Sequence, residues 1–261
     1  MSSPMIPEQR QKELLRLLRT AGVLSIRDLT ELMKVSHMTI RRDISNLEES
    51  GQVVAVQGGV RLAEHPGVEP PPERSSRAQL ELPRKRAIAE RAATLVEDGM
   101  VLFLDAGTTC ESVVPFLAAR RNITVVTNDY GTVAALFDYP EIETIHTGGV
   151  VDVESRSSSG PLAAATLASV NLDLCFLSTG TWDVPHGVTT PSTEKVVLKR
   201  AAMASASTSV LLADTTKFGT FERFNVVPLA KLDAVVTDSD LSETTGRALR
   251  DLGVDLHVAE L

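Results

Sequence analysis

The sequence predicts an α/β protein in two parts, a small winged helix-turn-helix domain followed by a larger α/β domain with a mainly parallel sheet. Three short amphipathic helical patterns and a Gly-Gly hairpin pattern occupy the first 62 residues. A proline-rich stretch follows, and from residue 81 onward short apolar runs alternate with helical segments. Such alternation is typical of βα units around a parallel sheet. We therefore expect domains at 1–62 and 81–261, joined by a linker at 63–80.

The composition is that of a globular protein. The chain has 261 residues, of which 43% are hydrophobic and 23% charged, with a net charge of -8. Its longest apolar runs have the length of strands, and its first residues lack the apolar core of a signal peptide. The two cysteines form no metal-binding or redox spacing. We expect a cytoplasmic protein with no membrane association, no cofactor and no metal.

The charge is divided unevenly along the chain. Residues 1–62 hold nine Lys or Arg against seven Asp or Glu, whereas the remaining residues hold 17 against 27. An acidic body with a mildly basic first domain is expected if only the first domain meets nucleic acid.

The helical patterns of the first domain bear on this expectation. Residues 8–20 carry a leucine stripe, and "SIRDLTELMK" begins with Ser25 and Asp28, an approximate capping box. After a short turn, Ser36 can cap a third helix, and Gly51 suits its end. The inner face of this third helix is formed by Ile40, Ile44 and Leu47.

The opposite face of the third helix carries two adjacent arginines. Met38, Arg41, Arg42 and Ser45 lie there at spacings of three and four residues. Taken alone, paired arginines on a helix are usually just solvated surface side chains. The order of capped helix, tight turn, capped helix and hairpin favours a winged helix-turn-helix, in which the helix after the turn enters the major groove. Arginines there bind guanine edges or phosphates.

The first 62 residues also resemble a known DNA-binding domain. They match the pattern "VS-x-x-TIRRD-x-x-x-LE-x-x-G" of the DeoR family of bacterial transcription regulators. The wing of that family commonly reads His-Gly-Gly-Ala, where this chain has Gln57-Gly58-Gly59-Val60. The resemblance implies that operator DNA is contacted by the third helix, with Ser36 and His37 nearer the phosphates, and by the wing. The expected DNA-binding residues are Ser36, His37, Thr39, Arg41, Arg42, Ser45, Gln57 and Gly58.

In the second domain, "FLDAGTTCESV" is the most informative stretch. An apolar strand ends at Asp105, and Gly107 leads into Thr108 and Thr109 at the start of a helix. Free N–H groups at a helix start can hold an anion, although an ordinary helix cap fits the same residues. Polar residues also follow other strands, at the edge where open α/β sheets bind ligands. They lie at 127–128, 148–149, 178–180 and 214–217, the last including Lys217.

The second domain resembles the sensor domain of the same family, which is similar to ribose-5-phosphate isomerase. The motifs "LDAGTT", "TN", "GG" and "D-x-x-K-F-G" carry this resemblance. It implies a pocket for a phosphorylated sugar or sugar-acid effector. The implied effector-binding residues are Lys85, Asp105, Gly107, Thr108, Thr109, Asn128, Gly180, Glu194 and Lys217.

The chain departs from the isomerase where proton transfer needs a base and an electrophile. The isomerase's Asp-Gly-Ala-Asp-Glu stretch and its following lysine are replaced by "STGTWDVPHGVTT". Glu194 remains as a base, but the electrophile is incomplete, so we expect binding without turnover. Trp182 either shapes the pocket or packs over the core, and His186 either donates to an acid group or lies at the surface.

We expect a sequence-specific transcription regulator, a repressor of a carbohydrate or sugar-acid catabolic operon. Its expected partners are double-stranded operator DNA, the effector, and further copies of itself in a dimer or tetramer. Two alternatives remain: an isomerase-like enzyme with an accessory DNA-binding domain, and a DNA-binding protein whose body is purely structural.

Overall fold

The computed structural model describes residues 6–49, 52–56, 59–62 and 74–261. The chain forms two compact units that divide between residues 71 and 72. The first unit contains the winged helix-turn-helix elements, and the second contains the larger α/β domain. Each is described by itself.

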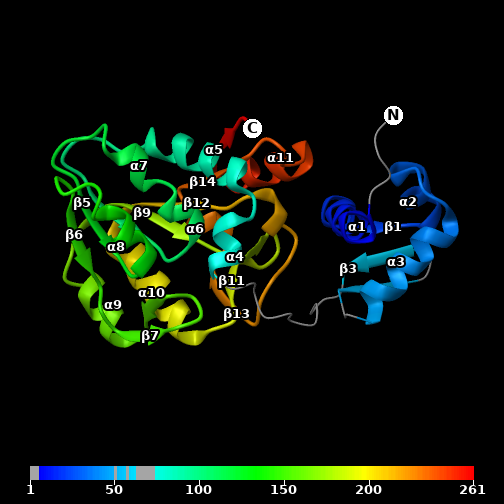
Figure 1. Cartoon of the computed structure of the whole chain (residues 1–261), viewed down its shortest axis with the longest axis horizontal. Helices are drawn as coiled ribbons and strands as arrows, with labels where there is room; N and C mark the ends of the chain where they lie inside the picture. The colour runs from blue at the N-terminus through cyan, green and yellow to red at the C-terminus, as the bar shows by residue number, and fades with distance from the viewer. Residues whose placement is uncertain (1–5, 50–51, 57–58, 63–73) are drawn as a thin grey trace. The chain divides into compact units, whose positions relative to one another are not determined.

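The first unit has the predicted three helices and a small antiparallel sheet (Figure 1). The sheet order is β1-β3-β2, and β2 and β3 form the predicted hairpin. The elements are α1 (Pro7–Ala21), β1 (Val23–Leu24), α2 (Ile26–Met33), α3 (His37–Glu49), β2 (Val53–Val56) and β3 (Gly59–Leu62).

Local signals explain the start of α2 and the approach of the strands. The Ser25 side chain accepts the Asp28 N–H at 3.1 Å, and the Asp28 carboxylate accepts the Ser25 backbone N–H at 3.2 Å, which forms the predicted capping box. In β3, a Cβ on Gly59 would collide with the carbonyl group of Leu24, so only glycine permits this strand to approach β1 closely. The predicted inner residues of α3, Ile40, Ile44 and Leu47, are buried in the core of this unit.

A seven-stranded sheet in which every strand pair is parallel forms the centre of the second unit. Its order is β15-β14-β12-β9-β4-β5-β6, so the predicted parallel α/β architecture is confirmed. The strands are β4 (Val101–Leu104), β5 (Thr124–Thr127), β6 (Glu143–His146), β9 (Leu172–Ser178), β12 (Ala206–Leu212), β14 (Ala234–Asp238) and β15 (Asp255–Ala259).

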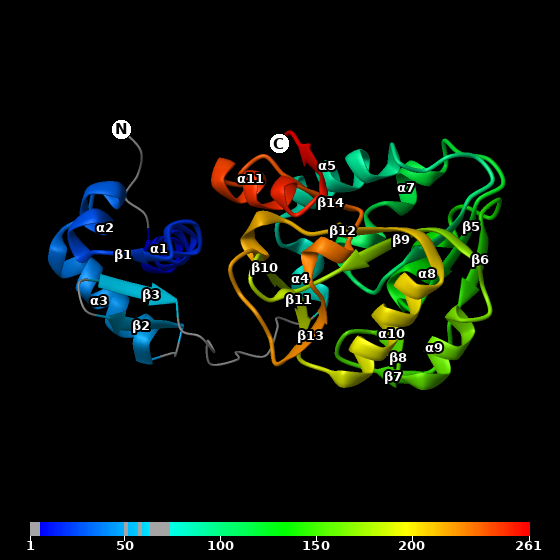
Figure 2. The same ribbon diagram turned by 180° about the vertical axis from the view of Figure 1, so that it is seen from behind.

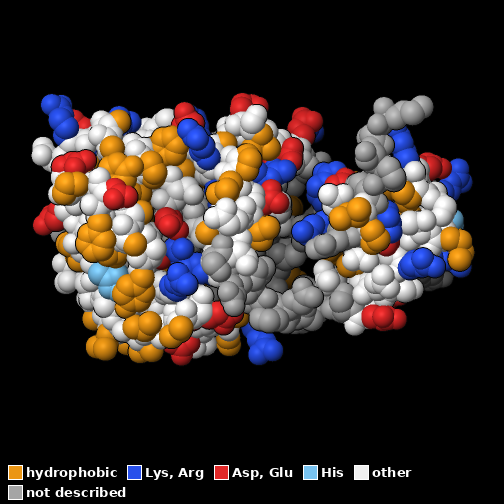
Figure 3. Space-filling view, viewed as in Figure 1, with side chains coloured by type: hydrophobic (Ala, Val, Ile, Leu, Met, Phe, Trp, Pro, Cys, Tyr) orange, Lys and Arg blue, Asp and Glu red, His pale blue; other side chains and the backbone are white. Residues whose placement is uncertain are grey.

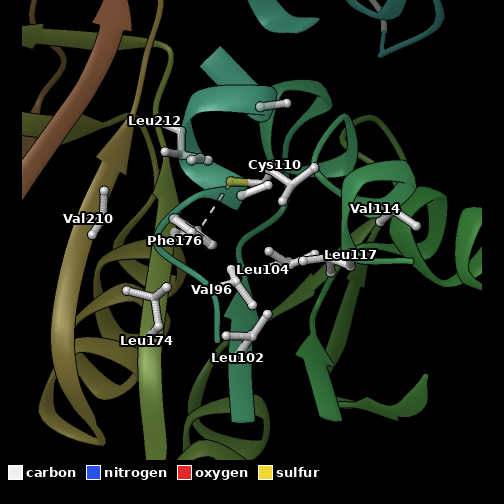
Figure 4. Close-up of a cluster of buried hydrophobic side chains, with 14 of the residues drawn as sticks. Val96, Leu102, Leu104, Cys110, Val114, Leu117, Leu174, Phe176, Val210 and Leu212 are labelled. Carbon is white, nitrogen blue, oxygen red and sulfur yellow. Dashed lines mark hydrogen bonds between the residues drawn. The ribbon is translucent and has the colours of Figure 1, made fainter. Parts of the chain in front are cut away.

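Helices cover both faces of this sheet, with α5 and α7 on one side and α9 and α10 on the other (Figure 2). Strand residues alternate accordingly, since Leu102 and Leu104 enter the core beneath α5 whereas Phe103 enters the core beneath α10. Figure 4 shows the first of these cores, where the Cys110 thiol lies 3.6 Å from the Phe176 carbonyl oxygen. The helices are α5 (Leu82–Ala93), α6 (Thr108–Glu111), α7 (Val114–Leu117), α8 (Tyr130–Leu136), α9 (Pro161–Leu167), α10 (Thr193–Ala204) and α11 (Glu243–Asp251).

The structure differs from the sequence-based expectation in three places. Residues 74–79, within the expected linker, form the helix α4 (Arg74–Gln79), which is fixed to the body by Arg74. Two small antiparallel sheets were not anticipated, because their strands have only three or four residues and lack a sustained apolar run. They contain β7 (Val150–Asp152) with β8 (Ser157–Ser159), and β10 (Thr181–Asp183) with β11 (Gly187–Thr190) and β13 (Phe224–Val227). The edge strand β15 was also missed.

Hydrophobic side chains are exposed on one face of the second unit, over α8, α9 and β7 (Figure 3). They include Phe137, Val150, Val153 and Leu162, of which Val153 is 83% exposed and Phe137 79%. No helix in the described part of the chain is long and apolar enough to cross a membrane.

Candidate functional site

The outer face of α3 presents two unpaired cations. Arg41 and Arg42 are both exposed, as are His37 and Ser45, and Met38 between them is 74% exposed. Among the residues that the structure describes, no carboxylate pairs with either arginine. Both guanidinium groups are therefore available to a polyanion.

The carboxylate that follows them in sequence is turned away from this face. Asp43 is 1% exposed and is bound by the Arg10 guanidinium of α1, with Arg10 Nη2 3.0 Å from Asp43 Oδ1. This contact raises the pKa of Arg10. Because Asp43 is occupied inside the unit, it does not neutralise Arg41 or Arg42. The sequence offered no local signal for this pair, since its members are 33 residues apart.

The start of α3 is capped as expected. The Thr39 N–H donates to the Ser36 hydroxyl at 3.2 Å, and the two hydroxyls share a hydrogen bond at 2.8 Å. Thr39 is half-buried, so its outer part alone reaches the face that carries the arginines. The wing residues Gln57 and Gly58 lie outside the described residues.

In the second unit, aspartates lie at the carboxyl ends of four central strands, and each is bound by one basic side chain. All four carboxylates are at most 1% exposed. Because buried carboxylates are costly without a partner, these pairs define the architecture of the sheet edge. The pairs are Asp105 with Lys199, Asp129 with Arg74, Asp214 with Lys217, and Asp238 with Arg84.

Asp105, the predicted centre of the site, is held by groups from three elements. It accepts the Ala106 N–H and the Ser178 N–H, each at 2.9 Å, and it pairs with Lys199 of α10. Lys199 also donates to the Ser178 carbonyl oxygen at 2.6 Å. Burial, followed by the negative charge of Asp105, raises the pKa of the nearby Cys175 thiol well above its usual range. Sequence reasoning missed Lys199.

Lys217 binds a second carboxylate, Asp214, beside the predicted turn, and the buried Lys85 adds positive charge to the same surroundings. Lys217 Nζ lies 3.1 Å from Asp214 Oδ2 and 3.4 Å from the Thr109 hydroxyl oxygen. Burial opposes ionisation of Asp214, but the charge of Lys217 and the hydrogen bonds from Thr216 and Lys217 together lower its pKa. Lys85 is buried, donates to the Leu80 carbonyl oxygen at 2.6 Å, and interacts electrostatically with both Lys217 and Asp214. Lys85 Nζ also donates to the Arg77 carbonyl oxygen, so its hydrogen bonds go to two backbone carbonyls, and among the described contacts Asp214 forms its ion pair with Lys217 alone.

The turn itself is tightly packed. The Ala106 N–H also donates to the Asn128 side-chain oxygen, and the Gly107 N–H donates to Asp129, both at 2.9 Å. A Cβ on Gly107 would lie 2.8 Å from Cβ of Ser178, which requires glycine here. Thr108 and Thr109 are buried at the start of α6. Asp105, Gly107, Thr109, Asn128, Lys85 and Lys217 thus belong to one connected cluster, which we call the anion cluster.

Two predicted residues lie apart from the contacts of this cluster. Glu194 is exposed in the first turn of α10, where its carboxylate accepts the Ser192 and Thr193 hydroxyls at 2.8 and 3.1 Å. The hydrogen bond from its own backbone N–H, followed by those from the Ser192 and Thr193 hydroxyls, lowers the pKa of Glu194, which makes it a poor proton acceptor. Gly180 is exposed after β9. No described contact joins either residue to Asp105 or Lys217.

Trp182 and His186 are both held by contacts with neighbouring side chains. Trp182 is fully buried and packs edge-on against Phe218 with ring centroids 4.8 Å apart, which agrees with a packed side chain. His186 Nδ1 lies 2.7 Å from Asp183 Oδ2, and its ring stacks on Phe221. Within the described ranges, no group of three or more His, Cys, Asp or Glu side chains is arranged to hold a metal ion.

Comparison with known families agrees with both halves of the chain. Residues 10–65 match the DeoR-like helix-turn-helix domain, and residues 81–239 match the DeoR C-terminal sensor domain. This chain belongs to the DeoR family. The family's helix-turn-helix domain implies DNA binding, and relatives of this DeoR-family protein are named as transcriptional regulators rather than enzymes.

Relatives match over nearly the full length. The HTH-type transcriptional regulator YgbI of Escherichia coli K12 is 40% identical over 98% of this chain and 99% of its own. A putative aga operon transcriptional repressor of Escherichia coli O157:H7 is 27% identical over 95% of this chain and 92% of its own. Among solved structures, ribose-5-phosphate isomerase A of Methanocaldococcus jannaschii is similar over 51% of this chain and 52% of its own, with 18% identity and a TM-score of 0.38.

Proposed function

We propose that this DeoR-family regulator represses a carbohydrate or sugar-acid catabolic operon, and that α3 binds the major groove of the operator. The exposed and unpaired Arg41 and Arg42 support the DNA contact. Repression rather than activation is supported by the name of one relative, the putative aga operon transcriptional repressor. The operator sequence is obtained experimentally, by selecting duplexes from a random library with the full chain.

We infer that the anion cluster binds a phosphorylated sugar or sugar-acid effector. The observation that carries this proposal is the position of Lys217, which pairs with Asp214 and lies 3.4 Å from the Thr109 hydroxyl oxygen, with the positive charge of the buried Lys85 acting on the same groups. A phosphate placed there accepts hydrogen bonds from ammonium and hydroxyl donors. Glu194 and Gly180 stay candidates for the sugar end of the ligand, as the family resemblance implies.

A thermal-shift screen tests effector binding. Ribose 5-phosphate, 6-phosphogluconate, their unphosphorylated counterparts and inorganic phosphate are added to the full chain. A ligand at about 100 times its Kd stabilises the folded state by about 2.7 kcal/mol, so a phosphorylated compound is expected to raise the Tm. Lys217→Met is expected to abolish this rise, whereas Lys231→Met, which removes an exposed lysine from another loop, preserves it. A rise that persists in Lys217→Met would place the ligand elsewhere.

Effector affinity is expected to fall as the pH rises through about 8. Burial, followed by the charge of Lys217, lowers the pKa of Lys85 from 10.5 to about 8. Above that pH, Lys85 loses the charge that attracts the anion.

The same pKa difference affects stability. Between pH 8 and pH 10.5, about the two pKa values of Lys85, the unfolded chain binds more protons than the folded chain, so Lys85 makes the free energy of unfolding increase with pH over this range. Isothermal titration across this range measures the affinity, and Lys85→Met is expected to weaken its pH dependence. Equal affinity on both sides of pH 8 in the unmodified protein contradicts this role.

We further propose that the protein is a homo-oligomer, a dimer or tetramer, assembled through the second unit. The exposed apolar side chains over α8, α9 and β7 support this, since large exposed apolar patches mark interaction sites. Paired half-sites in DNA also favour symmetric dimers of helix-turn-helix proteins. Sedimentation of the full chain measures the oligomeric state directly.

A further inference from the structure

Arg74 connects the anion cluster to the segment that leads toward the DNA-binding domain. It is the first residue of α4 and the first described residue after 63–73. Its side chain is 9% exposed and is shared by two carboxylates from different elements. Asp129 Oδ1 and Glu111 Oε2 each lie 2.8 Å from Arg74 Nη2.

Both carboxylates are also attached to the turn of the anion cluster. Asp129 accepts the Gly107 N–H, and Glu111 is the last residue of α6, the short helix that carries Thr109. The helix α4 lies beside α6 (Figure 1). Arg74 therefore holds the turn from two sides and at the same time fixes α4.

This arrangement makes the position of Arg74 dependent on the turn. In this structure Arg74 bridges Glu111 and Asp129. An anion bound by Thr109 and Lys217 would bring further negative charge toward these two carboxylates. Any shift of the turn toward the anion alters the distance from Arg74 to these two carboxylates. A guanidinium fork can also exchange a carboxylate for a phosphate, because it matches both geometries.

We propose that Arg74 is a positioning residue that couples the anion cluster to α4, so that effector binding loosens the Arg74–Asp129 pair and changes operator affinity. This inference rests on the proposed function, since it requires an anionic effector at the cluster. Arg84 keeps the start of α5 fixed by pairing with Asp238 and Asp240. The contact that we propose to change is therefore the one at the Arg74 end of the α4–α5 segment.

Gly131 offers a way to displace Arg74 without removing its charge. A Cβ on Gly131 would lie 2.6 Å from Arg74 Cζ, which is closer than two non-bonded carbon atoms can approach. The atoms that it meets are the far end of a flexible side chain, so the guanidinium moves and the backbone stays. Gly131 lies in α8, where alanine is a favourable residue. Its N–H, which donates to Asp129 at 2.7 Å, is retained in alanine.

The test measures operator affinity of the full chain by fluorescence anisotropy, with and without ribose 5-phosphate or inorganic phosphate. Gly131→Ala and Arg74→Gln are expected to shift operator affinity by at least about fivefold without any ligand, in the direction that the ligand causes in the unmodified protein, because allosteric couplings are about 5- to 150-fold. Added ligand then changes the affinity of either variant by less than about twofold. Arg74→Lys, which retains the charge, is expected to recover part of the ligand response.

Two controls separate coupling from damage to the fold. Gly246→Ala places a methyl group on another helical glycine, 3.3 Å from Leu256 Cδ2, and is expected to behave like the unmodified protein. Isothermal titration is expected to show that Gly131→Ala still binds the ligand. Unchanged ligand-free operator affinity in both Gly131→Ala and Arg74→Gln overturns the role of Arg74. Failure of the unmodified protein to bind any phosphorylated compound instead overturns the proposed function, whatever the variants do.

Discussion

Replacing Arg41 and Arg42 together with alanine is expected to abolish specific operator binding while leaving the Tm unchanged. Both side chains are exposed on the outer face of α3, and the nearest acidic residue in sequence, Asp43, is occupied by Arg10. An arginine that reads a base contributes about 1–3 kcal/mol to binding. An arginine that holds a phosphate instead contributes to the salt dependence, and its loss reduces the slope of log K against log salt concentration by about one. Anisotropy titrations at several salt concentrations separate these two roles for each single variant.

The matched control is Arg27→Ala. Arg27 is an equally exposed arginine of the same unit, but it lies on α2 and pairs with Glu31 at 3.2 Å. Its loss removes the same charge from the domain without altering the outer face of α3. We expect a change in operator affinity that is small beside that of the double variant. Equal losses in Arg27→Ala and in Arg41→Ala or Arg42→Ala would mean that the domain binds DNA through overall charge and not through α3.

Lys199→Met is expected to cause the largest loss of stability of any single substitution at the anion cluster. It leaves the Asp105 carboxylate buried without its cation, and breaking a buried pair in this way costs about 3–5 kcal/mol. Urea unfolding monitored by circular dichroism measures the change in the free energy of unfolding.

The double variant Asp105→Asn with Lys199→Met provides the comparison. It removes both charges together, so most of the stability is expected to return, because replacing an entire buried pair by neutral groups is often nearly neutral. The amide has a single acceptor oxygen, so it retains the hydrogen bond from either the Ala106 N–H or the Ser178 N–H, which the carboxylate accepts on separate oxygens, and the recovery is expected to be incomplete for this reason. Equal instability of the single and double variants would show that Lys199 acts through packing and not through its charge.

The elements that position both sites could be predicted from local sequence patterns. Ile40, Ile44 and Leu47 repeat with the helical period, so the orientation of α3 and the exposure of Arg41 and Arg42 followed directly. The apolar runs of the body ended at Asp105 and Asn128, and parallel strands bring such ends to one edge. The location of the anion cluster was therefore accessible without coordinates.

The cations that complete these sites could not be predicted in the same way. Lys199 lies 94 residues from Asp105, and Arg74 lies 55 residues from Asp129. Neither pair leaves a periodic or spacing signal, because each depends on how α10 and α4 pack over the sheet. Arg74 also lies among prolines and serines whose composition favours a linker. Glu194 was selected by its resemblance to an isomerase motif, and in the structure its carboxylate is bound to the first turn of its own helix.

Operator affinity with and without bound effector tests the account most directly. The selected duplex is titrated with the full chain, first alone and then with the phosphorylated compound that gives the largest thermal shift. The account predicts a change of about 5- to 150-fold in the dissociation constant, the usual range of allosteric coupling, and no such change in Lys217→Met. An operator affinity that stays the same while the compound demonstrably occupies the protein would contradict it.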